Sequence, residues 1–220
     1  MRSTKIKICG LTCDEDVDSV NEAQPDYAGM VLFFPKSRRN ISLERAEKLL
    51  RGLKMPGVAV TVSPTVEQVS DIAEAGFTLL QIHGKLDREI LKLNCVKSGK
   101  LRIIRAINSI NEESLKEIEY LRDKDEVSLY LFDAAEPGSG RSFDWNSIPD
   151  ANVLCKPFIL AGGLRPETVV EAVKTVHPFA VDVSSGVEKD ELPSIQEVEA
   201  GESMKSRDKI LSFVQNVDRI

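Results

Sequence analysis

The feature that most constrains this chain is the recurrence of short apolar segments, each ending at a polar or glycine-containing turn. The segments are rich in β-branched residues, which is typical of strands buried on both faces of a parallel sheet. Eight such segments occur, at Lys5–Cys9, Tyr27–Phe33, Gly57–Val62, Thr78–Ile82, Arg102–Ile107, Val127–Phe132, Phe158–Ala161 and Ala180–Val183. Alternation of eight parallel strands with helices predicts an α/β fold, a (β/α)8 TIM barrel.

Helices are expected between most of these strands. Amphipathic or capped runs predict them at Asp14–Ala23, Ser42–Arg51, Thr65–Ala75, Glu112–Arg122 and Lys205–Asn216, with another beginning beside Pro166. The sixth helix, near Asn146–Ile148, is expected to be stunted. We expect one domain over residues 1–220, because no linker or charge block divides the chain.

The alternative fold is an open doubly wound sheet. Such a sheet more usually shows a G-x-G-x-x-G turn after its first strand, whereas residues 9–14 read CGLTCD. The sequence therefore favours the barrel, in which functional side chains lie where the strands end.

Composition narrows the possible partners. The formal net charge of -6 and the pI near 5.2 argue against nucleic acid or an anionic membrane as partner. No apolar stretch approaches the roughly 18 residues of a membrane span, and no signal-peptide core follows Met1, so we expect a cytoplasmic protein. The four cysteines, Cys9, Cys13, Cys95 and Cys155, show no C-x-x-C spacing, and no metal site is predicted.

Two loops predict a phosphate site. Gly162 and Gly163 follow the seventh strand, and Ser184, Ser185 and Gly186 follow the eighth. Glycines let backbone N–H groups approach an anion closely, serine hydroxyls add donors, and barrels commonly hold phosphate at these two loops. A pair of tight turns without a ligand is the alternative interpretation.

Two residues at strand ends could exchange protons with a substrate. Asp133 ends an apolar strand and precedes a glycine-rich loop, and partial loss of water favours a carboxyl group that serves as general acid. An aspartate that merely caps a loop fits that stretch equally well. Cys9 ends the first strand, where a thiolate could serve as general base, although an inert buried thiol is the commoner case.

A basic loop follows the second strand. Lys36, Arg38 and Arg39 lie in it, and at a barrel mouth the planar fork of an arginine can hold a carboxylate. A solvated basic face is the alternative. His83 is interpreted as a polar group near the rim without a catalytic role.

Six motifs together resemble the phosphoribosylanthranilate isomerase family of tryptophan biosynthesis. They span nearly the whole chain in order: KICGLT at 7–12, FFPKSRRNIS at 33–42, QIHG at 81–84, GSGRSFDW at 138–145, LAGGLRPE at 160–167 and PFAVDVSSGVE at 178–188. The resemblance implies an Amadori rearrangement of N-(5-phosphoribosyl)anthranilate to 1-(2-carboxyphenylamino)-1-deoxyribulose 5-phosphate, without cofactor or metal. The implied partner is a small molecule carrying a phosphate and a carboxylate, and we expect a monomer rather than a homodimer.

The resemblance also implies roles for individual residues. Asp133 would be the general acid that opens the sugar ring, and Cys9 the general base that removes the C2 proton. Arg39 would hold the anthranilate carboxylate, and Asp182 would contact sugar hydroxyls. The phosphate would be bound by Gly162, Gly163, Ser184, Ser185 and Gly186.

Three stretches depart from the family pattern. Residues 58–63 read VAVTVS where a VGVFVN-like run is usual, the loop at 137–140 reads PGSG where two glycines are commoner, and the Glu188–Lys205 connection is long and acidic. None of them removes a residue with an implied role.

Two other functions are alternatives for a barrel of this kind. The histidine-pathway isomerase runs the same type of rearrangement but relies on aspartates after strands one and five, where this chain has Cys9 and the Ala106–Asn108 segment. A non-catalytic phosphate-binding barrel would keep the phosphate loops and lose the acid or the base, yet both Cys9 and Asp133 are present.

Overall fold

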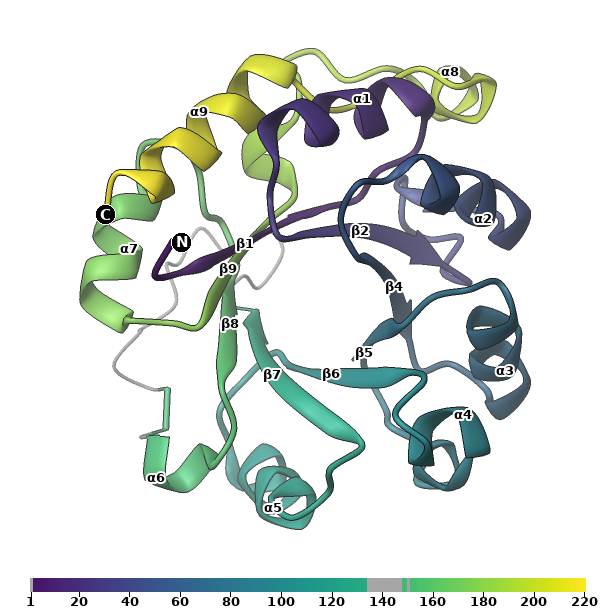
Figure 1. Ribbon diagram of the computed structural model, residues 1–220, viewed down its shortest axis with the longest axis vertical. Coiled ribbons are helices and arrows are strands. Elements are labelled where there is room, and N and C mark those ends of the chain that lie inside the picture. The colour runs from purple at the N-terminus through teal and green to yellow at the C-terminus, as the bar shows by residue number, and fades with distance from the viewer. Residues whose placement is uncertain (1, 134–147, 150) are drawn as a thin grey trace.

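The apolar segments form a closed ring of parallel strands in the computed structural model, which describes residues 2–133, 148–149 and 151–220 (Figure 1). The strands are β1 (Lys5–Cys9), β2 (Tyr27–Leu32), β4 (Gly57–Val62), β5 (Leu79–His83), β6 (Arg102–Ile107), β7 (Val127–Asp133), β8 (Phe158–Ala161) and β9 (Ala180–Val183). Each pairs with its neighbour in chain order, and β9 pairs with β1 to close the ring. The predicted (β/α)8 barrel is confirmed.

Strand alternation decides which side chains enter the barrel. On β1, Ile6 and Ile8 are buried in the apolar cluster between the strands and the outer helices. Lys7 and Cys9 alternate with them and therefore face the interior, where Cys9 joins an apolar cluster contributed by most of the strands. The last inward residue of each strand is consequently positioned at the rim.

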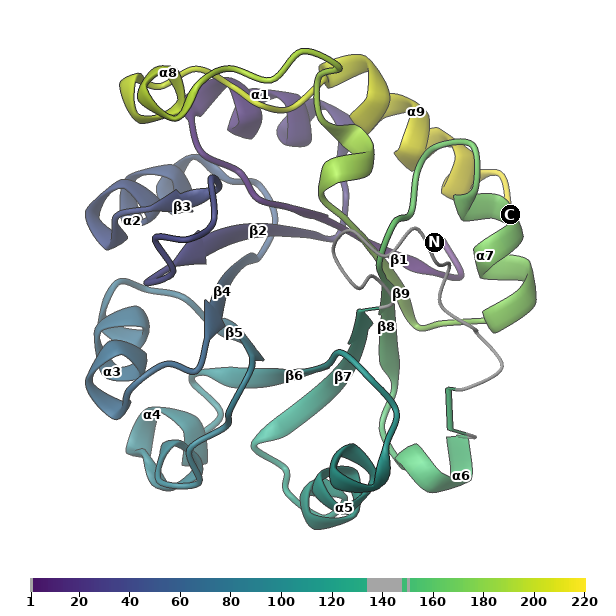
Figure 2. The same cartoon turned by 180° about the vertical axis from the view of Figure 1, so that it is seen from behind.

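The helices lie around the outside of the ring, as both views show (Figure 2). They are α1 (Asp14–Ala23), α2 (Leu43–Gly52), α3 (Val66–Glu74), α4 (Asn94–Lys97), α5 (Glu112–Leu121), α6 (Ala151–Leu154), α7 (Val169–Val176), α8 (Ile195–Ala200) and α9 (Arg207–Asp218). Helix α9 packs against both α1 and α7, and Arg2 Nε lies 2.9 Å from Asp218 Oδ1, so the two ends of the chain meet.

Most predicted helices agree with the structure to within about two residues, but the sixth does not. It is short, as expected, yet it spans Ala151–Leu154 rather than 146–148. Residues 146 and 147 of the predicted stretch lie outside the described residues, and Ile148 lies in a bend. Helix α7 begins at Val169, because Pro166 lies in the turn before it.

Several short elements were not predicted. They are β3 (Asn40–Ile41), η1 (Ile90–Lys92), α4, η3 (Ser185–Val187) and α8. Each is six residues or fewer, so none completes the two helical turns or the alternation on which a periodicity argument depends.

Two further observations concern the described part of the chain. No helix there has the length and apolar character needed to cross a membrane. Nor do three or more His, Cys, Asp or Glu side chains in these residues gather closely enough to hold a metal ion.

Candidate active site

A cavity of about 670 Å³, here called the mouth cavity, opens at the carboxyl ends of the strands. Most of the residues singled out from the sequence line it: Cys9, Arg39, Asp133, Gly162, Gly163, Asp182, Ser184 and Ser185. They come together because every strand of a parallel barrel ends on the same rim. Apolar side chains, among them Val31, Phe34 and Val60, line the same cavity.

Cys9 ends β1 on the inner wall of the mouth cavity and is 7% exposed. One layer deeper, the fully buried ammonium of Lys7 lies 3.0 Å from both carboxylate oxygens of Asp182. Burial raises the pKa of the Cys9 thiol above its ordinary value, and the positive charge of Lys7 is the largest influence that opposes this rise. The thiol therefore lies beside a buried ion pair.

Asp133 and His83 end strands β7 and β5, and both line the mouth cavity. Burial lowers the pKa of His83, and the negative charge of Asp133 is the largest influence that opposes this. The imidazole is therefore neutral at neutral pH. Its Nε2 lies 2.7 Å from the side-chain nitrogen of Gln81. Oε1 of that buried amide, which also lines the cavity, has no hydrogen-bond partner among residues 2–133, 148–149 and 151–220.

Arg39 forms a bidentate ion pair with Glu188. Its Nε and Nη2 lie 2.6 and 2.9 Å from the two carboxylate oxygens, and Lys205 Nζ lies 3.3 Å from Oε1. Burial would raise the pKa of Glu188, but the hydrogen bond from Arg39 and the charge of Lys205 outweigh it and lower the pKa. Arg39 Nη1 makes no hydrogen bond within the described residues.

The loops after β8 and β9 differ in what holds their backbone in place. Gly162 and Gly163 have φ values of 89° and 67°, a left-handed conformation that favours glycine. Ser184 is held by Lys205, whose Nζ donates to its backbone oxygen at 3.0 Å. Gly186, predicted to bind the ligand, does not line the cavity, because it packs against the backbone of the β8 loop. A Cβ at Gly186 would lie 1.9 Å from the Leu164 oxygen.

Reasoning from sequence missed Lys7, Gln81, Glu188 and Lys205. Alternation along β1 could have found Lys7, because a residue two positions before Cys9 must face the same interior. Gln81 precedes His83 by the same spacing. No sequence signal marks Glu188 or Lys205, since their partners come from distant segments.

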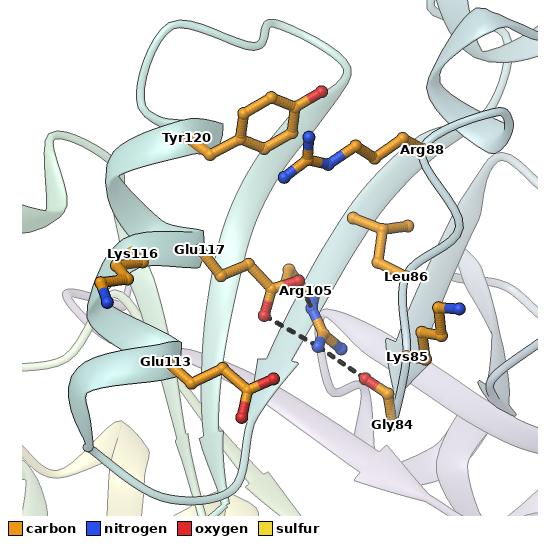
Figure 3. Close-up of a pocket in the computed structure, with 9 residues that line it drawn as sticks. All are labelled: Gly84, Lys85, Leu86, Arg88, Arg105, Glu113, Lys116, Glu117 and Tyr120. Carbon is orange, nitrogen blue, oxygen red and sulfur yellow. Dashed lines mark hydrogen bonds and ion pairs between the residues drawn. The ribbon is translucent and has the colours of Figure 1, made fainter.

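A second cavity, of about 550 Å³ and here called the side cavity, lies outside the barrel between α5 and the loop after β5 (Figure 3). Arg105 projects into it and pairs with Glu117, with Nε and Nη2 at 2.9 and 3.0 Å from its oxygens. The same guanidinium donates to the backbone oxygens of Ile82 and Gly84 at 2.8 and 2.6 Å. Every nitrogen of this arginine is therefore engaged.

Comparison with known proteins gives a consistent result. The family model of N-(5'-phosphoribosyl)anthranilate (PRA) isomerase matches residues 6–216. The N-(5'-phosphoribosyl)anthranilate isomerase of Petrotoga mobilis is 39% identical over 191 residues, which are 84% of this chain and 87% of the relative. The crystal structure of phosphoribosyl anthranilate isomerase from Thermotoga maritima is similar with a TM-score of 0.78 and 33% identity, covering 99% of this chain and 100% of that one.

A further solved structure is a complex. Phosphoribosyl anthranilate isomerase bound to reduced 1-(o-carboxyphenylamino)-1-deoxyribulose 5-phosphate is similar to this chain with a TM-score of 0.76 and 32% identity, covering 99% of this chain and 100% of that one.

The barrel is closed, and Asp133, Cys9 and the two loops after β8 and β9 lie on one rim. This arrangement defines the protein as a (β/α)8-barrel enzyme. Matches over nearly its whole length make the class specific: the chain belongs to the phosphoribosylanthranilate isomerase family. It is thus an isomerase, and the family's reaction is part of tryptophan biosynthesis.

Proposed function

We propose that the mouth cavity rearranges N-(5-phosphoribosyl)anthranilate to 1-(2-carboxyphenylamino)-1-deoxyribulose 5-phosphate. The observation that carries the proposal is the convergence of Cys9 and Asp133 on a single cavity, with Arg39 and the β8 and β9 loops on its wall. An aldose-to-ketose shift needs a proton donor and a proton acceptor around the C1–C2 unit, and this cavity holds one of each.

The carboxyl group of Asp133 donates a proton to the furanose ring oxygen, the C1–O bond breaks, and an iminium forms between C1 and the anthranilate nitrogen. The Cys9 thiolate then removes the proton from C2, which gives an enolamine that tautomerises to the ketone. Asp133 ends the cycle as carboxylate and Cys9 as thiol, so one proton returns from the thiol to the carboxylate through solvent before the next turnover.

The charged ends of the substrate match the two sides of the cavity. The backbone amides of Gly162 and Gly163, with the hydroxyls of Ser184 and Ser185, serve as donors for the phosphate. Nη1 of Arg39, which no described residue engages, is available to the anthranilate carboxylate, and the apolar lining packs against its ring. Asp182 remains a candidate contact for the sugar hydroxyls, although Lys7 faces both of its oxygens.

The test follows the loss of substrate fluorescence when pure protein meets freshly generated phosphoribosylanthranilate. We expect turnover by the parent and a fall in kcat/KM of about 10²–10⁴-fold for Cys9→Ala and for Asp133→Asn, with product binding retained. Glu113→Gln, which removes a carboxylate from the side cavity, is the matched control and keeps the parent rate. An inert parent that still binds the product would instead support a phosphate-binding barrel.

We further propose that the chain acts as a single-domain monomer in the cytoplasm. Cys9, Cys13 and Cys95 form no disulfide within the described residues, which supports a reducing compartment. The exposed large apolar side chains are scattered over several elements, including α5, α8 and the chain end, which supports a monomer. Light scattering coupled to gel filtration measures the mass, and a value twice 24.4 kDa would contradict the monomer.

A further inference from the structure

Lys7 is the most unusual residue of the barrel interior. Its side chain is fully buried, and the cluster of side chains inside the barrel, which includes Ile104, Leu129 and Ile159, is apolar. Removing an ammonium and a carboxylate from water is costly, and an apolar pair of similar volume would be at least as stable. Packing alone therefore does not explain why a lysine lies at this position.

Asp182 holds the ammonium in place. The two residues are register partners on the adjacent strands β1 and β9, and Lys7 Nζ lies 3.0 Å from each carboxylate oxygen. Two equal contacts to one carboxylate restrict the long, flexible lysine side chain to one position. The ion pair thus fixes a positive charge at a defined point beneath the rim.

That point is next to the sulfur of Cys9. Gly29 on β2 faces both head groups, since a Cβ built there would lie 2.9 Å from Cys9 Sγ and 3.1 Å from Lys7 Nζ. Both head groups thus lie about 3 Å from the same point, and the positive charge of Lys7 favours the thiolate. Glycine at position 29 leaves room for both head groups, because a Cβ there would crowd each of them.

Other charged groups around the thiol do not replace Lys7. The Lys205 charge also favours the thiolate, but its ammonium is shared between Glu188 and Ser184. Asp182 disfavours the thiolate. Among the residues that the structure describes, the remaining titratable or charged side chains that line the mouth cavity with Cys9 are His83, Asp133 and Arg39.

We propose that Lys7 is a positioning residue whose ammonium, anchored by Asp182, stabilises the Cys9 thiolate that acts as base. The catalytic half of this inference rests on the proposed function, whereas the stabilisation of the thiolate is a property of the free protein. Asp182 then fixes the position of the lysine ammonium, and its negative charge limits how strongly the lysine stabilises the thiolate.

The test measures the rate at which iodoacetamide alkylates Cys9 as a function of pH, because only the thiolate reacts. Peptide mass spectrometry separates Cys9 from the other cysteines, and the more accessible Cys95 is the internal reference. The variants are Lys7→Met, Asp182→Asn and the double variant. The double variant leaves no buried charge unpaired, so it keeps the test valid if Lys7→Met does not fold.

We expect Cys9 in the double variant to react about tenfold more slowly than in the parent at neutral pH. Asp182→Asn should react faster, because the lysine charge is then no longer offset. Cys95 should react equally in all variants. Parent-like alkylation of Cys9 in the double variant would overturn the inference while leaving the proposed function untouched.

The second part of the test measures kcat/KM as a function of pH. In the double variant, thiolate formation should shift to higher pH in the alkylation experiment. The acidic limb of its kcat/KM profile should shift to higher pH by the same amount. If alkylation slows but this limb does not move, Cys9 is not the base, and both its assigned role and that of Lys7 in the reaction fail.

Discussion

The mouth cavity and the side cavity are each lined by an arginine in a bidentate pair with a glutamate, yet they differ in what the arginine has left to offer. Arg105 uses all three nitrogens on Glu117 and on two backbone oxygens, and its side chain is 7% exposed. Arg39 uses Nε and Nη2 on Glu188 and keeps Nη1 unengaged within the described residues, with 25% exposure.

The difference separates a structural ion pair from a binding group. A guanidinium that bonds through all three nitrogens ties the β5 loop to helix α5, and with four of its five N–H groups engaged it keeps one, on Nη1, for any ligand. A guanidinium held by one edge is oriented but still able to bind. Substitutions of Arg105 and Arg39 test that distinction.

The largest effect on stability is expected from Arg105→Met. This variant leaves Glu117 unpaired and two backbone oxygens without their donor, so the free energy of unfolding should fall by about 2–4 kcal/mol. KM should change less than about threefold, since the side cavity is not the proposed substrate site. Urea unfolding and steady-state kinetics measure the two quantities. Lys116→Met, in an exposed pair with Glu112, is the control and should leave both unchanged.

Arg39→Met should show the opposite behaviour. Loss of a charge-assisted hydrogen bond to the anthranilate carboxylate should raise KM by about 10- to 100-fold, and Glu188 would keep Lys205 as partner. Arg39→Lys should recover only part of the affinity, because the planar fork is lost. The same KM in Arg39→Met and the parent would place the carboxylate elsewhere.

A pH dependence of stability is expected from the mouth cavity. Because burial lowers the pKa of His83 below its ordinary 6.5, the unfolded chain binds a proton near that pH more readily than the folded protein does. Stability should therefore be lost as the pH falls from about 6.5. His83→Gln should flatten the curve between pH 6.5 and 5.5 in urea unfolding. A slope that persists in this variant would have to come from another group. Glu188, with its lowered pKa, acts in the same direction at more acidic pH.

The smallest effect is expected at the outer edge of the side cavity, where the Arg88 guanidinium lies 3.9 Å from the Tyr120 ring centroid (Figure 3). Arg88→Ala should lower the free energy of unfolding by less than about 1 kcal/mol and leave kcat/KM unchanged. A large loss of activity would mean that the side cavity takes part in the reaction.

The sequence by itself determined the strands, the helices longer than two turns and the rim positions of the candidate residues. This was possible because burial of parallel strands produces apolar runs that end where the rim begins. Cys9 and Asp133 could be placed at the mouth from the last residues of two such runs. The position of α6 and the existence of α8 could not, because four- and six-residue elements have no readable period.

Only the tertiary structure decided how the candidate residues are held. Lys7 meets Asp182 across 175 positions of sequence, and Arg39 meets Glu188 across 149. Such pairs form because barrel closure brings the first and last strands together, and no local pattern encodes which distant charges then meet. The tertiary structure also shows that Gly186 packs against the β8 loop, where a side chain would collide with backbone, while its predicted contact with the phosphate stays a prediction.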